Sequence, residues 1–318
     1  MNSGSAALTL EVRHSTVYRY ASAVSLALHR AHLCPLVDEA QALEAFALDI
    51  EPPPAHRRDS VDAMGNAQIH FSLVQAHGAL RVTANSRVQV RARFAGLVPE
   101  EGLAWDTLVT DLRYVAGAPF DAAVEYVQPS PYVPRLAELR AYARPSFAPG
   151  RPAAVAALEL MQRVHTDFRY QSQSTRVDTP LAAAFAQRRG VCQDFAHLMI
   201  GCLRSLGLPA RYVSGYLLTR PPELPAGSAP MLGADASHAW AQVWCPGTPG
   251  VADGGGGGGW LDLDPTNNLV PGAGHVRVAI GRDYGDVTPL RGVIRGGGQH
   301  ELAVGVSTRV ADGTRMAR

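Results

Sequence analysis

The segment Arg189–Gly207 reads RGVCQDFAHLMIGCLRSLG and contains the clearest helix signal of the chain. Four apolar or small residues from Phe195 to Leu206 recur at helical spacing and form one stripe. Gly207 stands at the position where a glycine commonly ends a helix. The spacing therefore predicts an amphipathic helix over Cys192–Leu206, with one face in a hydrophobic core.

The elements on either side of this helix differ in kind. Helical periodicity precedes it, and strand-like alternation of β-branched and aromatic residues follows it. The expected helices are Val133–Ala143 and Pro152–His165, and the expected strands are Arg211–Leu218, His238–Trp244 and Trp260–Leu263. Helices followed by an antiparallel sheet predict an α+β domain at residues 151–295, with a linker and first helix at 121–150.

The first third of the chain has a different pattern. Short alternating runs are separated by turn signals such as Glu51–Pro54 and Met64–Asn66, which is typical of antiparallel strands. We predict an antiparallel β-sandwich over residues 1–120. At the other end, residues 296–318 are expected to form a strand, Glu301–Val310, and a tail. The run Gly254–Gly259 is expected to be a flexible loop between two strands.

The overall composition excludes several classes of function. The chain has 318 residues, 47% hydrophobic and 18% charged, with a formal net charge of +1. A global positive field for nucleic acid or a membrane surface is therefore not expected. All 29 basic residues are arginine, so lysine chemistry such as a Schiff base is excluded.

The four cysteines and the N-terminus indicate a compartment. Four cysteines without a CxxC pair do not form a disulfide framework in a chain of this length. The N-terminus lacks the pattern of a secretory signal, and no apolar stretch is long enough to cross a membrane. We therefore expect free thiols and a cytoplasmic location.

Cys192 is the candidate nucleophile. It opens the predicted helix, where backbone N–H groups lack helical partners and the helix dipole is positive. Both effects favour a thiolate, and the same N–H groups can bind an oxyanion. Cys202 on the apolar stripe and Cys245 at a strand end are better explained as small core residues.

His238 is the candidate general base for this thiol. It begins a strand on which His238, Trp240 and Gln242 share one face, while small apolar residues occupy the other. Trp240 is a candidate substrate contact on the same face. His197 lies on the helix of Cys192, about 140° around the axis, and is interpreted as structural.

Asp264 is the candidate acid of a triad. Asp262 and Asp264 project from one face of the next strand, which ends at Asp264-Pro265-Thr266. A carboxylate at this point can orient an imidazole and stabilise its protonated form, with Asp262 as the second choice. Cys192, His238 and one of these aspartates also form a weaker alternative, a zinc site, but that ligand set is sparse.

Three motifs, GVCQDFAH, SHAW and GWLDLDPTNN, resemble the transglutaminase-like superfamily in their order and spacing. They are most similar to its bacterial branch, which is described as candidate cysteine proteases with a β-rich N-terminal region. The resemblance implies a papain-like α+β core and a triad of Cys192, His238 and Asp264. It implies no cofactor, and no calcium-binding pattern of spaced acids is present.

The expected function is thiol-dependent acyl transfer on amide bonds of peptides or proteins, by hydrolysis in preference to cross-linking. The backbone N–H of Cys192 is expected to bind the oxyanion, with Tyr170 or Gln171 as the second donor from its position. A transglutaminase that uses an amine acceptor is the first alternative. A non-catalytic binding or scaffold protein that keeps the fold is the second. No metal, nucleic acid or membrane is expected as a partner.

Overall fold

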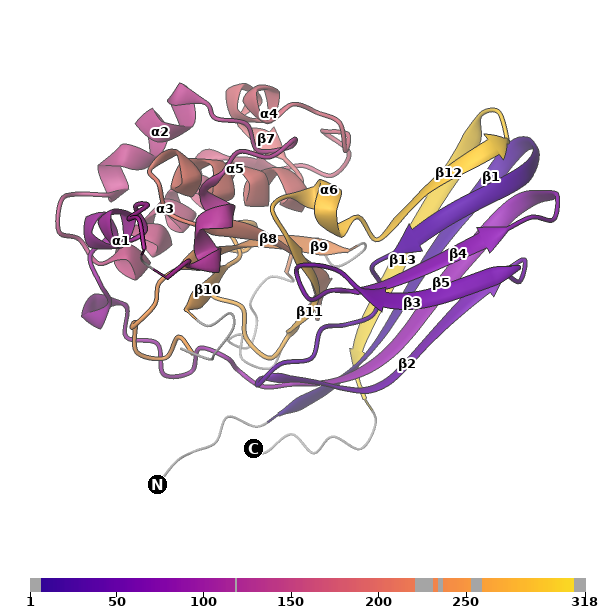
Figure 1. Ribbon diagram of the computed structural model, residues 1–318, viewed down its shortest axis with the longest axis horizontal. Coiled ribbons are helices and arrows are strands. Elements are labelled where there is room, and N and C mark those ends of the chain that lie inside the picture. Colours follow the sequence, from indigo (N-terminus) through magenta and orange to yellow (C-terminus); the bar gives the residue numbers. More distant parts are fainter. Residues whose placement is uncertain (1–6, 118, 221–230, 234–236, 253–258, 312–318) are drawn as a thin grey trace.

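The computed structural model describes residues 7–117, 119–220, 231–233, 237–252 and 259–311, and it has two parts (Figure 1). A strand-rich part and a helical part lie side by side, and a four-stranded sheet stands between the helices and the strands. Residues 254–258 of the glycine run lie outside the described residues, so the expected loop there is not described. Among the described residues, no helix is long and apolar enough to span a membrane.

The strand-rich part is one antiparallel sheet with two halves, and both halves contain the same long strand, β1. The first half of β1 pairs with β5 and β13, and its second half pairs with β4 and β12. β2 and β3 extend the sheet through β5 and β4. The strands are β1 (Leu8–Ala31), β2 (Gln41–Glu51), β3 (His56–Val61), β4 (Ala67–Leu73), β5 (His77–Val90), β12 (Leu290–Gly296) and β13 (His300–Val310).

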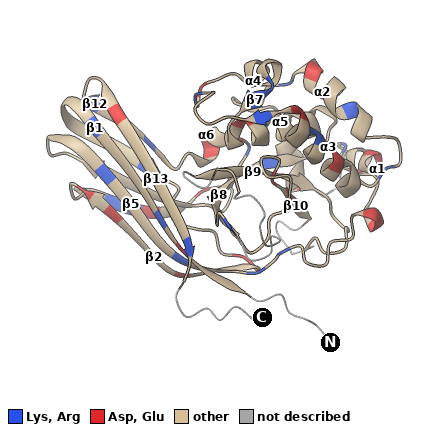
Figure 2. Cartoon of the chain, turned by 180° about the vertical axis from the view of Figure 1, so that it is seen from behind, with Lys and Arg blue, Asp and Glu red and all other residues tan. Residues whose placement is uncertain are grey.

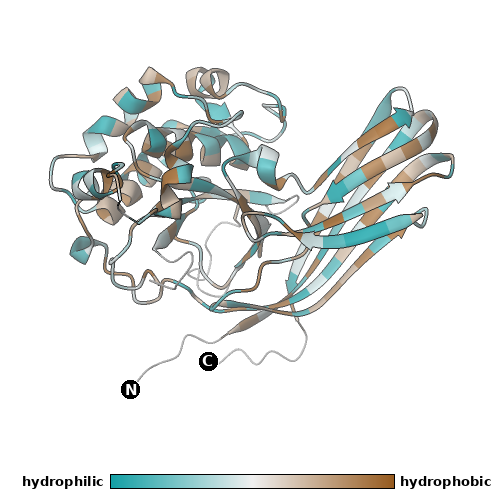
Figure 3. Cartoon of the chain, in the orientation of Figure 1, coloured by the Kyte–Doolittle hydropathy of each residue, from teal (hydrophilic) through white to brown (hydrophobic). Residues whose placement is uncertain are grey.

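The two halves of this sheet share one hydrophobic core. Its pairing register shifts between Arg19 and Val24 of β1, where one half gives way to the other. Side chains from both halves, such as Val82 of β5 and Phe71 of β4, lie in the same buried cluster. Hydrophobic and hydrophilic bands alternate along the strands (Figure 3), as expected for strands with one buried face. The predicted sandwich thus takes the form of one sheet with two halves that share β1.

The exposed side of these strands carries paired charges. Arg87 lies 2.8 Å from Glu44 and 2.9 Å from Glu11, and Arg309 lies 2.8 Å from the same Glu11. Basic and acidic residues are interspersed on this sheet (Figure 2). These contacts pair opposite charges across β1, β2, β5 and β13.

The predicted domain limits need correction at both ends. Phe94, Trp105 and Leu108 lie in the core of the helical part, so the strand-rich part ends near residue 90 and not near 120. At the C-terminal end, β12 and β13 both pair with β1, so residues 290–310 belong to the strand-rich part. Pairing between the two ends of a chain is a long-range choice that local patterns do not encode.

The helical part is built around one buried helix. α5 (Cys192–Ser205) packs on β9 and lies among four other helices. These are α1 (Trp105–Asp111), α2 (Ala137–Ala143), α3 (Ala153–Asp167) and α4 (Leu181–Gln187), with 3-10 turns at Pro99–Glu101, Ala122–Val127 and Arg144–Ser146. The short strands β6 (Arg169–Tyr170) and β7 (Arg189–Gly190) run parallel to each other just before α5.

The four-stranded sheet has the order β10-β9-β8-β11. Its strands are β8 (Ala210–Leu217), β9 (His238–Trp244), β10 (Trp260–Leu263) and β11 (His275–Gly281), and the short helix α6 (Tyr284–Val287) follows β11. Ala239, Ala241 and Val243 of β9 join the helical core, as their alternation predicts. Tyr216 and Val276 instead join a cluster with Leu10 of the strand-rich part. The sheet is therefore covered from both sides.

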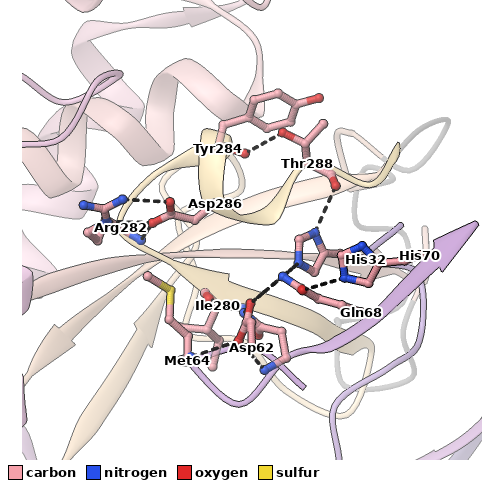
Figure 4. A network of polar contacts seen from close by, with 11 residues as sticks. His32, Asp62, Met64, Gln68, His70, Ile280, Arg282, Tyr284, Asp286 and Thr288 are labelled. Atoms are coloured by element: carbon pink, nitrogen blue, oxygen red, sulfur yellow. Dashed lines mark hydrogen bonds and ion pairs between the residues drawn. The ribbon is translucent and has the colours of Figure 1, made fainter. Parts of the chain in front are cut away.

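Buried polar contacts also join the two parts (Figure 4). The side-chain amide of the fully buried Asn66 donates to the carbonyl of Ile280 at 2.8 Å and accepts from its N–H at 2.7 Å. Nearby, burial lowers the pKa of His32, whose Nδ1 donates to the carbonyl of Thr288 at 3.2 Å. The neutral ring can then accept from Gln68 at 3.1 Å.

Replacing Asn66 by alanine should destabilise the chain. The change leaves a buried N–H and a buried C=O of Ile280 unpaired, which costs about 2 to 4 kcal/mol in the free energy of unfolding. Urea unfolding followed by circular dichroism measures this. The matched control is Asn85→Ala, which removes only an exposed contact to Asp49 and should change stability by less than about 0.5 kcal/mol. Equal effects of the two variants would contradict this account of the interface.

Candidate active site

A side-chain cap fixes the start of α5. The carboxylate of Asp194 accepts from the backbone N–H of Val191 at 2.8 Å and from the hydroxyl of Thr175 at 2.6 Å. A Cβ atom on Gly190 would lie 2.6 Å from this carboxylate, so the residue at this position must be glycine. Gly190 and Asp194 thus place the first turn of the helix, and with it Cys192.

Cys192 is the first residue of α5 and is half-buried. The N–H groups of a first helical turn have no intrahelical acceptor, and the helix dipole adds positive potential there. The Sγ atom of Cys192 lies 3.9 Å from the carbonyl oxygen of Ser237, the residue before β9. The helix start and the strand start therefore meet at the thiol.

His238 opens β9 and is almost completely buried. Its Nε2 atom lies 2.8 Å from Oδ2 of Asp264, which follows β10. An ionised carboxylate only accepts hydrogen bonds, so Nε2 of His238 carries a proton. The other ring nitrogen, Nδ1, is buried and has no hydrogen-bond partner among the residues that the structure describes. Nδ1 is therefore the nitrogen that can take up and release a proton.

The carboxylate of Asp264 accepts five hydrogen bonds. Oδ1 accepts from the backbone N–H groups of Thr266 at 3.0 Å and Asn267 at 3.2 Å. Oδ2 accepts from His238 at 2.8 Å, from the side chain of Asn267 at 2.8 Å, and from Nε2 of His275 at 3.2 Å. Burial alone would raise the pKa of Asp264, but the two histidines hold it well below its usual range.

The same contacts set the charge of His238. Burial alone would lower its pKa, but the Asp264 carboxylate and the neighbouring Cys192 thiol raise it to about 10. His238 is then protonated at neutral pH, and a positive imidazolium beside a thiol favours the thiolate. The site can therefore hold a thiolate–imidazolium pair in front of a buried carboxylate.

The second-choice acid, Asp262, is engaged elsewhere. Its Oδ2 accepts from Arg277 of β11 at 3.0 and 2.7 Å, and its Oδ1 accepts from the side chain of Gln242. Arg277 also pairs with Asp38 of the strand-rich part, which in turn pairs with Arg93. Asp262 thus belongs to a buried network between the two parts, and Asp264 is the acid beside His238.

The three remaining predicted site residues differ in exposure. Trp240 is completely buried, and its ring lies 5.4 Å from the ring of His275, so it supports the histidines and does not line a substrate surface. Tyr170 pairs with Gly190 of β7, and the N–H of the next residue, Gln171, donates to the carbonyl of Gly190 at 2.9 Å. Both residues therefore lie close to the start of α5, and Gln171 is exposed. Their role as oxyanion donors stays a prediction.

Sequence reasoning missed several residues of the site. His275, Asn267 and Asp194 all contact it, and Tyr284 of α6 lies close enough to Cys192 for the thiol to influence its pKa, which burial raises to about 12. The alternation in β11 places a histidine and an arginine on one face, but it cannot say which carboxylate each one meets.

One group of described side chains has the composition of a metal site. His238, Asp264 and His275 offer ligand atoms within 4.8 Å of one another, and Cys192 is not part of this group. The nitrogen–oxygen distances of 2.8 and 3.2 Å are those of N–H donors to a carboxylate, which also accepts from Asn267. The group is therefore better described as a hydrogen-bonded cluster, and the zinc alternative built on Cys192 gains no support from it.

The fold and the cluster define a papain-like α+β protein with a cysteine at a helix start and a histidine and an aspartate on the following strands. The chain belongs to the transglutaminase-like superfamily, whose family model matches residues 140–265. A second model, the bacterial transglutaminase-like N-terminal region, matches residues 10–89. The first match spans the cysteine helix and the aspartate, and the second lies within the strand-rich part.

The relatives include uncharacterized and named proteins. An uncharacterized protein of Mycobacterium tuberculosis is 40% identical over 287 residues, which cover 89% of this chain and 86% of that protein. A protein-glutamine gamma-glutamyltransferase of Pseudomonas aeruginosa is 33% identical over 127 residues, which cover 39% of this chain and 17% of that protein. A crystal structure of a candidate cysteine protease from Cytophaga hutchinsonii matches with a TM-score of 0.70 at 21% identity, over 97% of this chain and 92% of that chain. This likeness supports the fold.

The Asp264–His238 pair should make stability depend on pH in a defined direction. The pKa of His238 is raised to about 10, so its stabilisation is complete below its ordinary value of about 6.5 and is lost as the pH rises toward 10. The pKa of Asp264 is lowered, so its contribution is present above about pH 4 and is lost in acid. Asp264→Asn should therefore lower the free energy of unfolding by about 3 to 5 kcal/mol near pH 6, and by less near pH 9.5.

Urea unfolding at the two pH values measures this difference. The control is Asp59→Asn, which breaks an exposed ion pair with Arg57 and should cost no more than about 1 kcal/mol at either pH. A cost of Asp264→Asn that stays constant or grows with pH would contradict the charge assignment.

Proposed function

We propose that this chain is a thiol-dependent acyl-transfer enzyme that cleaves amide bonds of peptides or proteins, with water as the acceptor. Cys192 acts as the nucleophile, His238 as the acid and base, and Asp264 as the group that orients His238. The observation that carries the proposal is the hydrogen bond of Nε2 of His238 to Asp264. Because this bond engages Nε2, Nδ1 is the nitrogen of His238 that can exchange a proton with the thiol of Cys192.

The first half of the reaction forms an acyl-enzyme. Nδ1 of His238 holds the thiol proton while Sγ of Cys192 attacks the amide carbonyl. The negative oxygen that results is bound by the N–H of Cys192, with Gln171 or Tyr170 as the second donor. When the C–N bond breaks, His238 gives its proton to the leaving amine, and a thioester remains.

The second half releases the acyl group. The sulfur of the thioester carries no negative charge. His238, which has given its proton to the leaving amine, must be neutral in order to take a proton from the attacking water. The tetrahedral intermediate then collapses, the C–S bond breaks, and the carboxylic acid leaves. The sulfur leaves as a thiolate and the proton stays on His238, so the thiolate–imidazolium pair is restored.

An amine as acceptor is the second candidate, and the name of the Pseudomonas relative favours it. In this case a primary amine takes the place of water, and a new amide forms instead of an acid. The chain has no lysine, so it cannot cross-link itself through a lysine side chain. The two reactions share the thioester and differ only in its last step.

The test is an amide turnover assay on dimethylated casein, with and without methylamine. We expect new amino groups or ammonia to appear in water, with little incorporation of methylamine. Cys192→Ala should lower turnover by about three orders of magnitude or more. The matched control is Cys34→Ala, which changes another half-buried cysteine and should keep full turnover.

Two results would contradict parts of the proposal. Incorporation of methylamine that exceeds hydrolysis would replace the peptidase or amidase with a transglutaminase. Turnover that survives in Cys192→Ala, or no turnover in the unmodified chain with either acceptor, would reject the enzyme and favour a binding protein.

A further inference from the structure

A second histidine faces the triad carboxylate and has no part in the acyl-transfer scheme. His275 begins β11, and its Nε2 atom lies 3.2 Å from Oδ2 of Asp264, the same oxygen that His238 contacts. His275 is 5% exposed, so water cannot easily replace it as a partner of the carboxylate. Two imidazoles therefore compete for one carboxylate oxygen.

The direction of both hydrogen bonds follows from the charge of Asp264. An ionised carboxylate accepts hydrogen bonds and cannot donate them, so His275 donates its Nε2–H just as His238 does. A donor to a carboxylate draws negative charge toward itself and makes the oxygen a weaker acceptor for other donors. His275 must therefore weaken the attraction between Asp264 and His238.

Asp264 does not need His275 to stay in place. The backbone N–H groups of Thr266 and Asn267 hold Oδ1, and the side chain of Asn267 holds Oδ2 at 2.8 Å. Loss of His275 would leave these three donors intact. Its contribution is therefore mainly to the charge of the carboxylate and less to its position.

Among the described residues, the side chain of His275 makes its hydrogen bond to Asp264, and its other neighbours are the following. From β9, the ring of Trp240 lies 5.4 Å away and the ring of His238 lies 6.2 Å away. From β8, the residue paired with His275 is the apolar Leu217. Arg277, two positions along β11, donates to Asp262. Asp264 and His238 are thus the titratable groups through which His275 can act.

We propose that His275 is a positioning residue for the proton of His238: its hydrogen bond to Asp264 weakens the stabilisation of the imidazolium. This inference rests on the proposed function, because the second half of the reaction requires a neutral His238 that can take a proton from the attacking water. In the acyl-enzyme, a histidine that keeps its proton cannot activate water. After His238 has given its proton to the leaving amine, His275 favours the neutral ring, so that His238 is not protonated again before water attacks.

The direct test is the titration of His238 in a chain whose Cys192 is capped with iodoacetamide. The cap removes the thiolate, as the acyl group does, so the ring responds to Asp264 and His275. We compare the unmodified chain with His275→Leu and His275→Gln by NMR of labelled histidines. The resonance of His238 is assigned by its absence in His238→Ala.

His275→Leu should raise the pKa of capped His238 by roughly one unit, the scale of a hydrogen bond to a charged group. His275→Gln keeps an N–H donor of similar reach and should stay near the unmodified value. In the pH profile of amide turnover, the acidic limb should move to higher pH by the same amount in His275→Leu. His29→Leu removes another buried histidine, on β1, and should change neither measurement.

A purely structural role gives the opposite result. A loosened site would weaken the contact with Asp264, lower the pKa of capped His238 and slow turnover at every pH. An unchanged or lowered pKa in His275→Leu, or the same shift in His275→Gln, would overturn the proposal. If His275→Leu does not fold, His275→Met serves as the variant without the donor.

The titration is independent of turnover. A chain that hydrolyses no amide would reject the proposed function, while the pKa of capped His238 would still decide whether His275 tunes it.

Discussion

The carboxylate of Asp264 is the interaction on which the site depends. It is completely buried, yet five donors from three segments keep it ionised and in one orientation. Because an ionised carboxylate only accepts hydrogen bonds, it fixes the tautomer of His238 and leaves Nδ1 for proton transfer. It also joins the ends of β9, β10 and β11 at one point. The chemistry proposed for Cys192 follows from this arrangement.

The rest of the fold brings the thiol to this carboxylate. Asp194 caps α5 and Gly190 makes room for the cap, so the helix begins at Cys192. Small residues on one face of β9 let α5 pack closely, and the opposite face carries His238. The strand-rich part covers much of that opposite face, and contacts such as Asn66 with Ile280 hold it there. The two parts therefore support one site.

Local patterns in the sequence are enough for the elements and for much of the candidate site. The helix expected over Cys192–Leu206 is observed as α5, and the strand expected over His238–Trp244 is β9. These features depend on periodicity within about fifteen residues. His275 and the return of β12 and β13 to β1 could not be predicted in this way, because they depend on which strands become neighbours. The short helix α1 carries too few residues for its period to mark the domain boundary.

The most direct test of this account is the rate of iodoacetamide alkylation at Cys192 as a function of pH, located by mass spectrometry. It is measured in the unmodified chain and in His238→Ala. An activated thiol should be labelled rapidly well below the ordinary thiol pKa of about 8.5, and this reactivity should be lost or shifted to higher pH in His238→Ala. Labelling that follows an ordinary thiol and does not change in His238→Ala would contradict the thiolate–imidazolium pair.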